Sequence, residues 1–255
     1  SDSMKQKKVK KAGLRKGGFT FKQFFVAHDK CEMKVGTDGV LLGAWAPITK
    51  AKTVLDIGTG SGLIALMLAQ RAPQVERIDG IELDEDAALQ ARENAQQSQW
   101  SSLIHIYHHD IYQYAQQAPT RYDLIVSNPP YFEPAVACRN QEREQARYTK
   151  TLTHEGLLDN AQQLITDEGL FCVVLPYLIG EQFIEISQRK GWNVVQRVNI
   201  KDSADKPYHR ILLAFQRQYQ GETKPCNIEE LIIRNNDGHY TTQFQSWVTD
   251  FYLYY

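Results

Sequence analysis

The stretch Val54-Leu55-Asp56-Ile57-Gly58-Thr59-Gly60-Ser61-Gly62 decides the fold of this 255-residue chain. A short buried-strand pattern ends in three glycines spaced two apart, and an apolar helical pattern over 63–71 follows at once. Glycine allows sharp turns and close approach of the backbone to a ligand. The segment therefore predicts a strand, a ligand-binding loop and a helix start, and in open α/β sheets ligands bind beyond the carboxyl ends of the strands.

Strand and helix patterns alternate outward from this stretch. The first strands are continuously apolar, as is typical of parallel strands covered on both faces, whereas the last two have no helix between them and should pair antiparallel. The expected fold class is α/β, with a Rossmann-like, seven-stranded, mainly parallel sheet. We predict strands over 53–57, 77–83, 104–108, 122–127, 170–175, 193–200 and 210–216, and helices over 38–45, 63–71, 85–97, 157–165 and 180–190.

Small elements are expected at both ends of this fold. The aromatic-rich residues 19–36 predict a short hairpin or cap, and Thr37 or Asp38 is a suitable N-cap for the helix that follows. Near the other end, Asn235-Asn236-Asp237-Gly238 predicts a hairpin turn, and 243–252 predicts a closing amphipathic helix. We expect one domain over 19–255 and a flexible basic arm over 1–18, of which residues 1–3 resemble a cloning remnant.

Charge is unevenly distributed along the chain. Of its 29 Lys and Arg and 30 Asp and Glu, residues 1–16 hold seven basic and one acidic, which leaves a net charge of −7 on the rest. A basic arm on an acidic body suits contact with phosphates, although a solvated tail without a partner has the same composition. Within the arm, Arg15 and Lys16 adjoin the folded body and are predicted to bind substrate.

The cysteines predict neither a zinc site nor a disulfide framework, because they are scattered and form no C-x-x-C pair. Free cysteines suit a reducing compartment. No apolar run is long enough to span a bilayer, and no apolar stretch follows the basic N-terminus as in a signal peptide. We expect a cytoplasmic protein without a membrane segment or a metal. We also expect a monomer, because the sequence shows no exposed apolar stripe that would demand a partner.

Acidic side chains stand where three successive predicted strands end: Asp56, Glu82 and Asp110. The glycine spacing differs from the G-x-G-x-x-G of dinucleotide sites, and Asp56 would repel a diphosphate. The Asp56 carboxylate would instead attract the cationic amino acid end of S-adenosylmethionine, directly or through water. Glu82 can accept both hydroxyls of a ribose, and Asp110 can accept an adenine amino group while Ile111 packs on the ring.

We therefore predict an S-adenosylmethionine site at this edge of the sheet. The alternative interpretation is that the glycines form only a tight turn and that the acidic residues only cap helices. The predicted cofactor-binding residues are Asp56, Gly58, Thr59, Gly60, Gly62, Glu82, Leu83, Asp110 and Ile111.

Asn128-Pro129-Pro130-Tyr131 follows the fourth strand and is predicted to be catalytic. An adenine amine is a weak nucleophile because its lone pair is delocalised into the ring, so a site that holds both amine protons can orient that lone pair. The Asn128 side-chain oxygen and the Pro129 carbonyl are suitable acceptors in a stiff loop. Tyr131 can stack on an extracted base. Methyl transfer then depends on alignment and needs no metal; the alternative is a rigid loop with no chemistry.

The glycine motif together with Asn-Pro-Pro-Tyr resembles the class I amino methyltransferases. Phe-Thr-Phe-Lys-Gln-Phe at 19–24, His-Asp-Lys-Cys at 28–31 and the stretch 33–45 (MKVGTDGVLLGAW) are similar to the start of the bacterial tRNA1(Val) adenine-N6 methyltransferases. The resemblance runs from about residue 15 to Asp-Phe-Tyr-Leu at 250–253. The two short motifs are widely shared, so residues 34–45 are the more discriminating part.

This resemblance implies methylation of the N6 amine of adenosine 37, just 3′ of the anticodon of a valine tRNA. It also implies that Thr37 and Asp38 contact the cofactor, although a helix cap explains them equally well. An anticodon loop suits this chain because sequence-specific RNA reading favours unpaired loops with splayed bases. Phe132, Arg139 and Arg143 follow the catalytic motif and are predicted to meet the flanking nucleotides, although alternating glutamates also fit a solvated helix face.

Other functions remain open from the sequence. The Asn-Pro-Pro-Tyr motif can also hold the amide of a protein glutamine. However, only about fifty residues precede the glycine motif, which is short for a protein-recognition domain. Methylation of a guanine amine in ribosomal RNA or of an adenine in DNA is a second alternative. A non-catalytic RNA-binding protein is a third, but such a protein has no use for the Asn128-to-Tyr131 arrangement.

Overall fold

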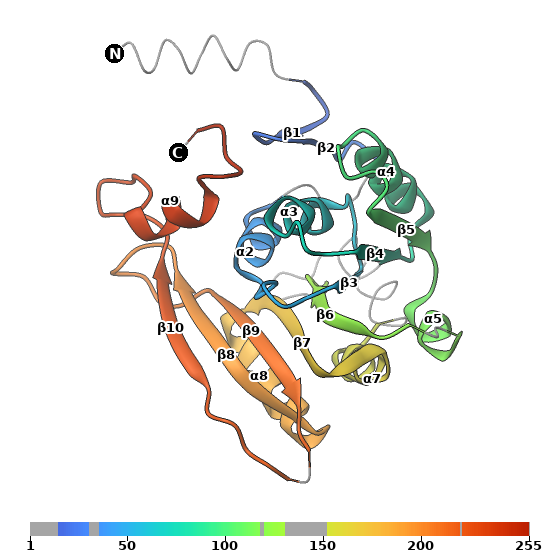
Figure 1. The fold of residues 1–255 in the computed structure, drawn as a ribbon. Coiled ribbons are helices and arrows are strands. Elements are labelled where there is room, and N and C mark those ends of the chain that lie inside the picture. The colour runs from blue at the N-terminus through green and yellow to red at the C-terminus, as the bar shows by residue number, and fades with distance from the viewer. Residues whose placement is uncertain (1–14, 31–35, 118–119, 131–151, 220, 255) are drawn as a thin grey trace, which may run out of the picture.

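The computed structural model describes residues 15–30, 36–117, 120–130, 152–219 and 221–254. Within these residues the main sheet has eight strands in the order β10-β8-β9-β7-β6-β3-β4-β5 (Figure 1). Neighbouring strands pair in parallel except around β9, which is antiparallel to both β7 and β8. The strands are β3 (Thr53–Ile57), β4 (Arg77–Glu82), β5 (Ile104–His108), β6 (Tyr122–Ser127), β7 (Ile165–Pro176), β8 (Trp192–Lys201), β9 (Arg210–Arg217) and β10 (Asn227–Ile232).

Helices cover both faces of this sheet, which confirms the predicted α/β class (Figure 1). Alternate residues of β3 show the arrangement, because Val54 joins one hydrophobic core and Leu55 and Ile57 join the other. The first core is closed by α2 (Thr37–Trp45), α3 (Leu63–Arg71), α4 (Glu85–Gln96) and α9 (Thr242–Val248). The second is closed by α5 (Ile111–Gln117), α7 (His154–Leu164) and α8 (Tyr177–Arg189).

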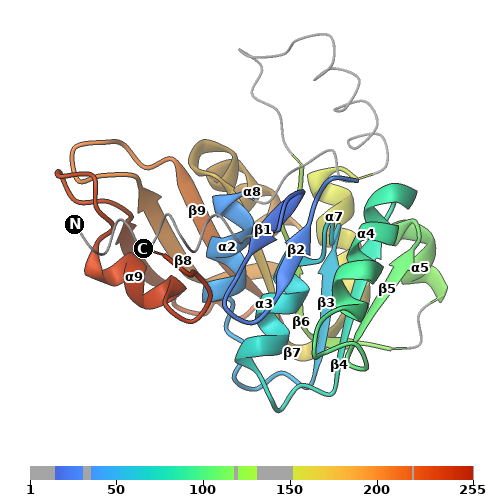
Figure 2. The same ribbon diagram turned by 90° about the horizontal axis from the view of Figure 1, so that it is seen from above.

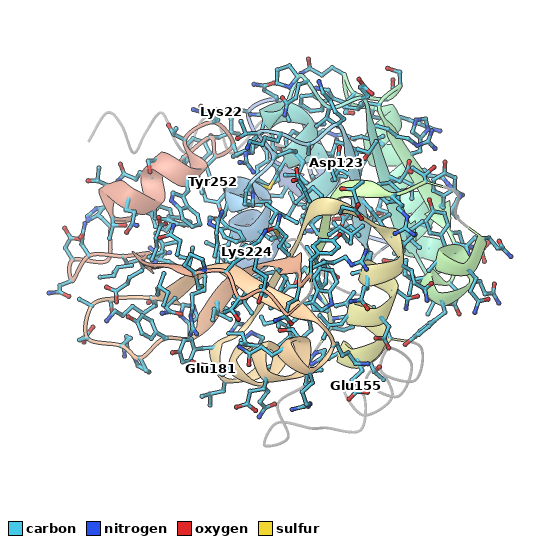
Figure 3. All side chains as sticks on the ribbon, turned by 60° about the horizontal axis from the view of Figure 1, so that its bottom comes forward. Lys22, Asp123, Glu155, Glu181, Lys224 and Tyr252 are labelled. Carbon is cyan, nitrogen blue, oxygen red and sulfur yellow. The ribbon has the colours of Figure 1, made fainter. Side chains whose placement is uncertain are left out.

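A two-stranded hairpin precedes the main fold, as the aromatic-rich N-terminal segment predicts. We call β1 (Gly18–Thr20) and β2 (Phe25–Ala27), which pair antiparallel, the N-terminal hairpin; it lies against α4 (Figure 2). Lys22 joins this hairpin to the C-terminal segment, since its backbone N–H donates to Phe251 O at 2.8 Å and its Nζ to Thr249 O at 2.5 Å. Figure 3 shows Lys22 and Tyr252 close together at this junction.

The strand count was predicted wrongly, because eight strands rather than seven form the main sheet in the described residues. The additional strand, β10, pairs in parallel with β8, and its first four residues are exposed. A half-exposed edge strand lacks the apolar pattern that marks the inner strands. The predicted C-terminal hairpin is reduced to a turn with Gly238 at φ +85° and a single antiparallel bridge, Arg234–Tyr240.

Several element boundaries also differ from the prediction. Helix α7 begins three residues early, at His154, because the Thr153 hydroxyl accepts from Gly156 N at 2.9 Å and caps it. Strand β7 begins five residues early, at Ile165, and pairs with β6 through a register shift. Helix α8 begins directly after Pro176, and α9 ends at Val248 rather than near residue 252.

Candidate active site

The glycine loop, residues 58–62, turns the chain from β3 into α3. Gly58, Gly60 and Gly62 have φ of +73°, +55° and +87°, a left-handed backbone that other residues adopt only with strain. Gly58 N and Thr59 N donate to Ile81 O at 2.8 and 3.1 Å, which fastens the loop to the end of β4. A Cβ at Gly58 or Gly60 would meet no atom of the described residues within 4 Å, so the loop borders open space.

Asp56 is a fully buried carboxylate just before the glycine loop. Its Oδ2 accepts from the Thr59 hydroxyl at 2.8 Å, whereas Oδ1 has no hydrogen-bond partner among the described residues. Burial raises the pKa of the Asp56 carboxyl to about 7; the Thr59 hydrogen bond opposes this shift, and the charge of Glu82 adds to it. A buried carboxylate oxygen without a partner fits a cationic ligand group, because a second charge would stabilise the ionised form.

Glu82 ends β4 and is bonded to the loop on one side and to α4 on the other. Its Oε1 accepts from Gly60 N at 2.9 Å and its Oε2 from Asp84 N at 2.9 Å. Burial raises the pKa of Glu82, while these two backbone hydrogen bonds act in the opposite direction. Each carboxylate oxygen can accept a further hydrogen bond, so this fixed carboxylate can still receive ribose hydroxyls.

The third acidic residue, Asp110, lies between β5 and α5. Its Oδ1 accepts from Tyr112 N at 2.8 Å, as in a helix cap, and Ile111 is buried in the second core. Leu83 is half-buried after β4, and its carbonyl lies 2.9 Å from Nε2 of His108. Of the three acidic residues, Asp110 thus has the capping role given as the alternative interpretation. After Glu82, the cap of α4 is Asp84, which accepts from Ala87 N.

The predicted catalytic segment begins directly after β6 and beside the glycine loop. Ser127 pairs with Ile57 across the sheet, and its hydroxyl donates to Ile57 O at 2.9 Å. Asn128 and Gly58 are therefore the next residues of two adjacent strands, which brings the two motifs to one edge. Pro129 is buried, and Pro130 is half-buried.

Helix α2 starts differently from the prediction. The N-cap residue is Gly36, without a side-chain hydrogen bond, so Thr37 and Asp38 lie in the first turn rather than at the cap. Thr37 is exposed, and both carboxylate oxygens of Asp38 accept from Arg210 Nε, at 2.9 and 3.0 Å. Asp38 therefore joins α2 to the start of β9 through the charged Arg210, instead of capping the helix.

Four predicted site residues lie outside the described residues: Tyr131, Phe132, Arg139 and Arg143. Arg15 and Lys16 are described and exposed, but they stand at the foot of the N-terminal hairpin and not in the row of strand ends. The Arg15 guanidinium carbon lies 4.0 Å from the centroid of the Phe25 ring, which holds this part of the arm on the hairpin.

Three residues around the glycine loop were not predicted from the sequence. Asn94 on α4 donates to Ser61 O in the glycine loop, Ser127 ties β6 to β3, and Gly80 lies beside Thr59 in β4. None of them is charged, and Ser127, although it is the last residue of β6, lies before the Asn128 motif rather than within it. Only the position of Gly80, a glycine inside an apolar strand, was a recognisable sign of a close approach.

No cluster of three or more His, Cys, Asp or Glu in the described ranges could hold a metal ion. In the same ranges, no helix has the length and apolar character needed to cross a bilayer.

Comparison with known proteins agrees with this arrangement. Residues 31–187 match the family model described as the methyltransferase small domain. A crystal structure described as a predicted O-methyltransferase from Agrobacterium tumefaciens superposes with a TM-score of 0.66 at 14% identity, over 84% of this chain and 96% of that one. TrmN from Thermus thermophilus superposes with a TM-score of 0.51 at 20% identity, over 70% of this chain and 48% of that one. The chain therefore contains a methyltransferase small domain and has the class I methyltransferase fold.

Curated relatives narrow this class further. Two proteins named tRNA1(Val) (adenine(37)-N6)-methyltransferase, from Proteus mirabilis (strain HI4320) and from Photorhabdus laumondii, are 99% and 61% identical over 252 residues. Each alignment covers 99% of this chain and 100% of the relative. The chain belongs to the tRNA1(Val) (adenine(37)-N6)-methyltransferase family, and this family and fold imply S-adenosylmethionine as the methyl donor.

Proposed function

We propose that the protein transfers a methyl group from S-adenosylmethionine to the N6 amine of adenosine 37 in a valine tRNA. The relatives named above carry this activity in their names, and they align over their full length. The observation that carries the proposal is the single edge of the sheet at which Asp56, the glycine loop and Asn128 meet.

The residues at this edge fit the cofactor. When bound, S-adenosylmethionine supplies a methyl group on a positively charged sulfur. Asp56 Oδ1, which has no partner in the described part of the chain, is suited to the ligand's ammonium group. Glu82, held by two backbone N–H groups, is suited to accept ribose hydroxyls, and Asp110 Oδ2 is suited to accept from the adenine amine, with Ile111 proposed to pack on the ring.

The proline segment is suited to the target amine. We infer that the Asn128 side-chain oxygen and the Pro129 carbonyl each accept one amine proton, which directs the nitrogen lone pair at the methyl group. Pro129 and Pro130 stiffen the chain and bring no competing N–H. Tyr131 is proposed to stack on the extracted base, and Phe132, Arg139 and Arg143 to meet its neighbours.

The proposed organisation assigns tRNA binding to two parts of one chain. Residues 19–255 would form the single methyltransferase domain, and the basic arm before them would contact phosphates through residues that include Arg15 and Lys16.

Incubation with labelled S-adenosylmethionine and total RNA from a strain that lacks the gene tests this function. We expect label in N6-methyladenosine of a valine tRNA after nucleoside analysis. Label in a guanosine, in another RNA or in protein would contradict the proposed substrate and favour one of the alternatives.

The catalytic assignment has its own test in Asn128→Ala. We expect methylation to fall by at least about a hundredfold, because two positioned acceptors orient the amine and one is lost. Binding of S-adenosylhomocysteine, measured by calorimetry, should change less than threefold, since Asn128 is assigned to the amine. Tyr131→Ala should behave in the same way, and full activity in either variant would refute the assignment.

A further inference from the structure

Asn94 uses its amide to bridge two segments that are distant in sequence. It lies in α4 with 3% of its surface exposed. Nδ2 donates to Ser61 O at 2.7 Å and to Ala27 O at 2.9 Å, and Oδ1 accepts from Ala27 N at 3.0 Å. The side chain thus pairs with Ala27 as a neighbouring strand would, while it also holds a peptide of the glycine loop.

The Ser61 carbonyl is the atom at which Asn94 holds the glycine loop. Ser61 stands between Gly60 and Gly62, which both have a left-handed backbone, and the peptide that carries its carbonyl is also held by Gly62 N, which donates to Thr59 O at 2.9 Å. The Thr59–Gly60 peptide of the same loop is held by Glu82, because Gly60 N donates to its carboxylate. Helix α4 is bonded to the loop in two ways. Asn94 donates to Ser61 directly, and the N-cap residue Asp84 donates through its N–H to Glu82, which holds Gly60; the position of α4 therefore affects the position of the loop.

Ala27 connects the same amide to the basic arm. In the N-terminal hairpin, Ala27 pairs with Gly18, which follows Arg15 and Lys16 at the foot of the arm. His28 N donates to Gly17 O at 3.0 Å, so the pairing extends one step toward those two cations. The Asn94 amide therefore joins the N-terminal hairpin to the glycine loop directly by hydrogen bonds.

We propose that Asn94 is a positioning residue for methyl transfer, which locks the glycine loop to the N-terminal hairpin so that bound RNA strengthens cofactor binding. The inference rests on the proposed function, because it takes RNA to be the ligand of the basic arm. In this arrangement RNA phosphates at Arg15 and Lys16 restrain the hairpin, Asn94 passes the restraint to Ser61, and the loop is held ready for the cofactor.

Gln90 provides a matched control one helical turn earlier. It is also buried, with 1% exposed, and its Oε1 accepts from Lys30 N at 3.0 Å. Gln90 therefore holds the segment after the hairpin, but within the described residues it makes no hydrogen bond to the glycine loop. Both Gln90→Leu and Asn94→Leu remove a buried amide. Gln90→Leu removes the bond to Lys30, whereas Asn94→Leu removes the bonds to Ala27 and also releases Ser61.

Calorimetric titration with S-adenosylhomocysteine, with and without unmethylated valine tRNA, tests the proposal. We expect Asn94→Leu to weaken binding about five- to tenfold without RNA, as for the loss of an oriented hydrogen bond, and Gln90→Leu to change it less than twofold. The tRNA should strengthen binding in the wild type and in Gln90→Leu, and should have no such effect in Asn94→Leu. Arg15→Gln with Lys16→Gln should reduce the effect in the wild type.

The outcomes separate this proposal from the function on which it rests. If the wild type methylates valine tRNA but the tRNA strengthens ligand binding equally in Asn94→Leu, or in no protein, the role of Asn94 is refuted while the function stands. If the wild type methylates no tRNA, the function itself fails. Asn94→Asp, which keeps the acceptor for Ala27 N and loses both donated bonds, gives the same comparison if the leucine variant does not fold.

Discussion

At the scale of single residues, the raised pKa of Asp56 predicts that cofactor binding depends on pH. Its carboxyl is buried, and the pKa is raised from 3.8 to about 7, so the group is mainly protonated below neutral pH in the free protein. An ammonium group beside Oδ1 favours the ionised form. We therefore expect the affinity for S-adenosylhomocysteine to rise about tenfold between about pH 6 and about pH 8, as measured by calorimetry. In Asp56→Asn the affinity should be low and nearly independent of pH.

The same group should influence stability without ligand. Because the folded-state pKa is higher than the unfolded value, the folded protein binds the extra proton between about pH 4 and about pH 7. The contribution of Asp56 to the free energy of unfolding is therefore complete below about pH 4 and is lost as the pH rises through 7. Denaturant titrations should show a smaller decline over this interval in Asp56→Asn, and an unchanged decline would contradict the raised pKa.

Gly80 keeps the Thr59–Asp56 pair in place from the neighbouring strand. A Cβ at this position would lie 2.9 Å from Thr59 Oγ1 and 2.8 Å from Ile106 Cδ1. Gly80→Ala should therefore displace Thr59, lower the free energy of unfolding by about 1–3 kcal/mol and weaken ligand binding. Gly221→Ala, at an exposed turn with open space around it, should cost stability but leave ligand binding unchanged. Equal ligand binding in wild type and Gly80→Ala would exclude the packing role.

Sequence reasoning predicted site residues at strand ends and in the two motifs, and it missed Asn94, Ser127 and Gly80. Asp56, Glu82 and Asp110 stand at strand ends, where the topology of a parallel sheet brings side chains together, so their row follows from the pattern. Asn94 lies inside an ordinary amphipathic helix pattern, and nothing local shows that its partners are Ala27 and Ser61. Such contacts depend on tertiary packing between segments that are far apart in sequence.

At the scale of secondary-structure elements, α5 and α7 are packed so closely that one glycine is required. A Cβ at Gly156 in the first turn of α7 would overlap the Tyr112 hydroxyl of α5. Gly156→Ala should lower the free energy of unfolding by about 1–3 kcal/mol, and it should weaken ligand binding because α5 begins beside Asp110 and Ile111. Thermal unfolding and calorimetry measure both effects. Tyr112→Leu should relieve part of the loss in the double variant, whereas additive losses would show that the two helices are not coupled here.

The predicted elements were correct where apolar periodicity is strong and wrong where caps or edges decide. Strands β3, β5 and β6 and helix α3 have the predicted bounds. Strands β3 and β6 and helix α3 are mainly apolar, and β5 alternates two buried isoleucines with more exposed residues. The start of α7 depends on the Thr153 cap, and β10 is a largely exposed strand with two glutamates. Its pairing with β8 is set by hydrogen bonds along the backbone rather than by its own side-chain pattern.

At the scale of the whole molecule, the charge distribution predicts how the protein binds RNA. The chain outside residues 1–16 has a net charge of −7, so it repels a polyanion at long range, and the seven cations of the arm must offset that repulsion. Phosphate contacts release counterions, which makes the logarithm of the affinity fall linearly with the logarithm of salt concentration, by roughly 0.7–0.9 per contact. Replacement of all seven arm cations by glutamine should therefore weaken tRNA binding and flatten this slope by several such increments.

Arg15→Gln alone separates two contributions to that result. Arg15 also lies against the Phe25 ring, so its loss removes packing on the hairpin as well as one charge. If the arm acts through phosphates, Arg15→Gln alone should reduce the slope of log affinity against log salt concentration by at most the value for about one contact. The variant with all seven cations replaced should reduce it by the value for several contacts. Filter-binding titrations of valine tRNA over a series of salt concentrations measure both slopes. Were the seven-fold variant to keep the wild-type slope, the phosphate contacts would have to lie on the acidic body, despite its repulsion of RNA.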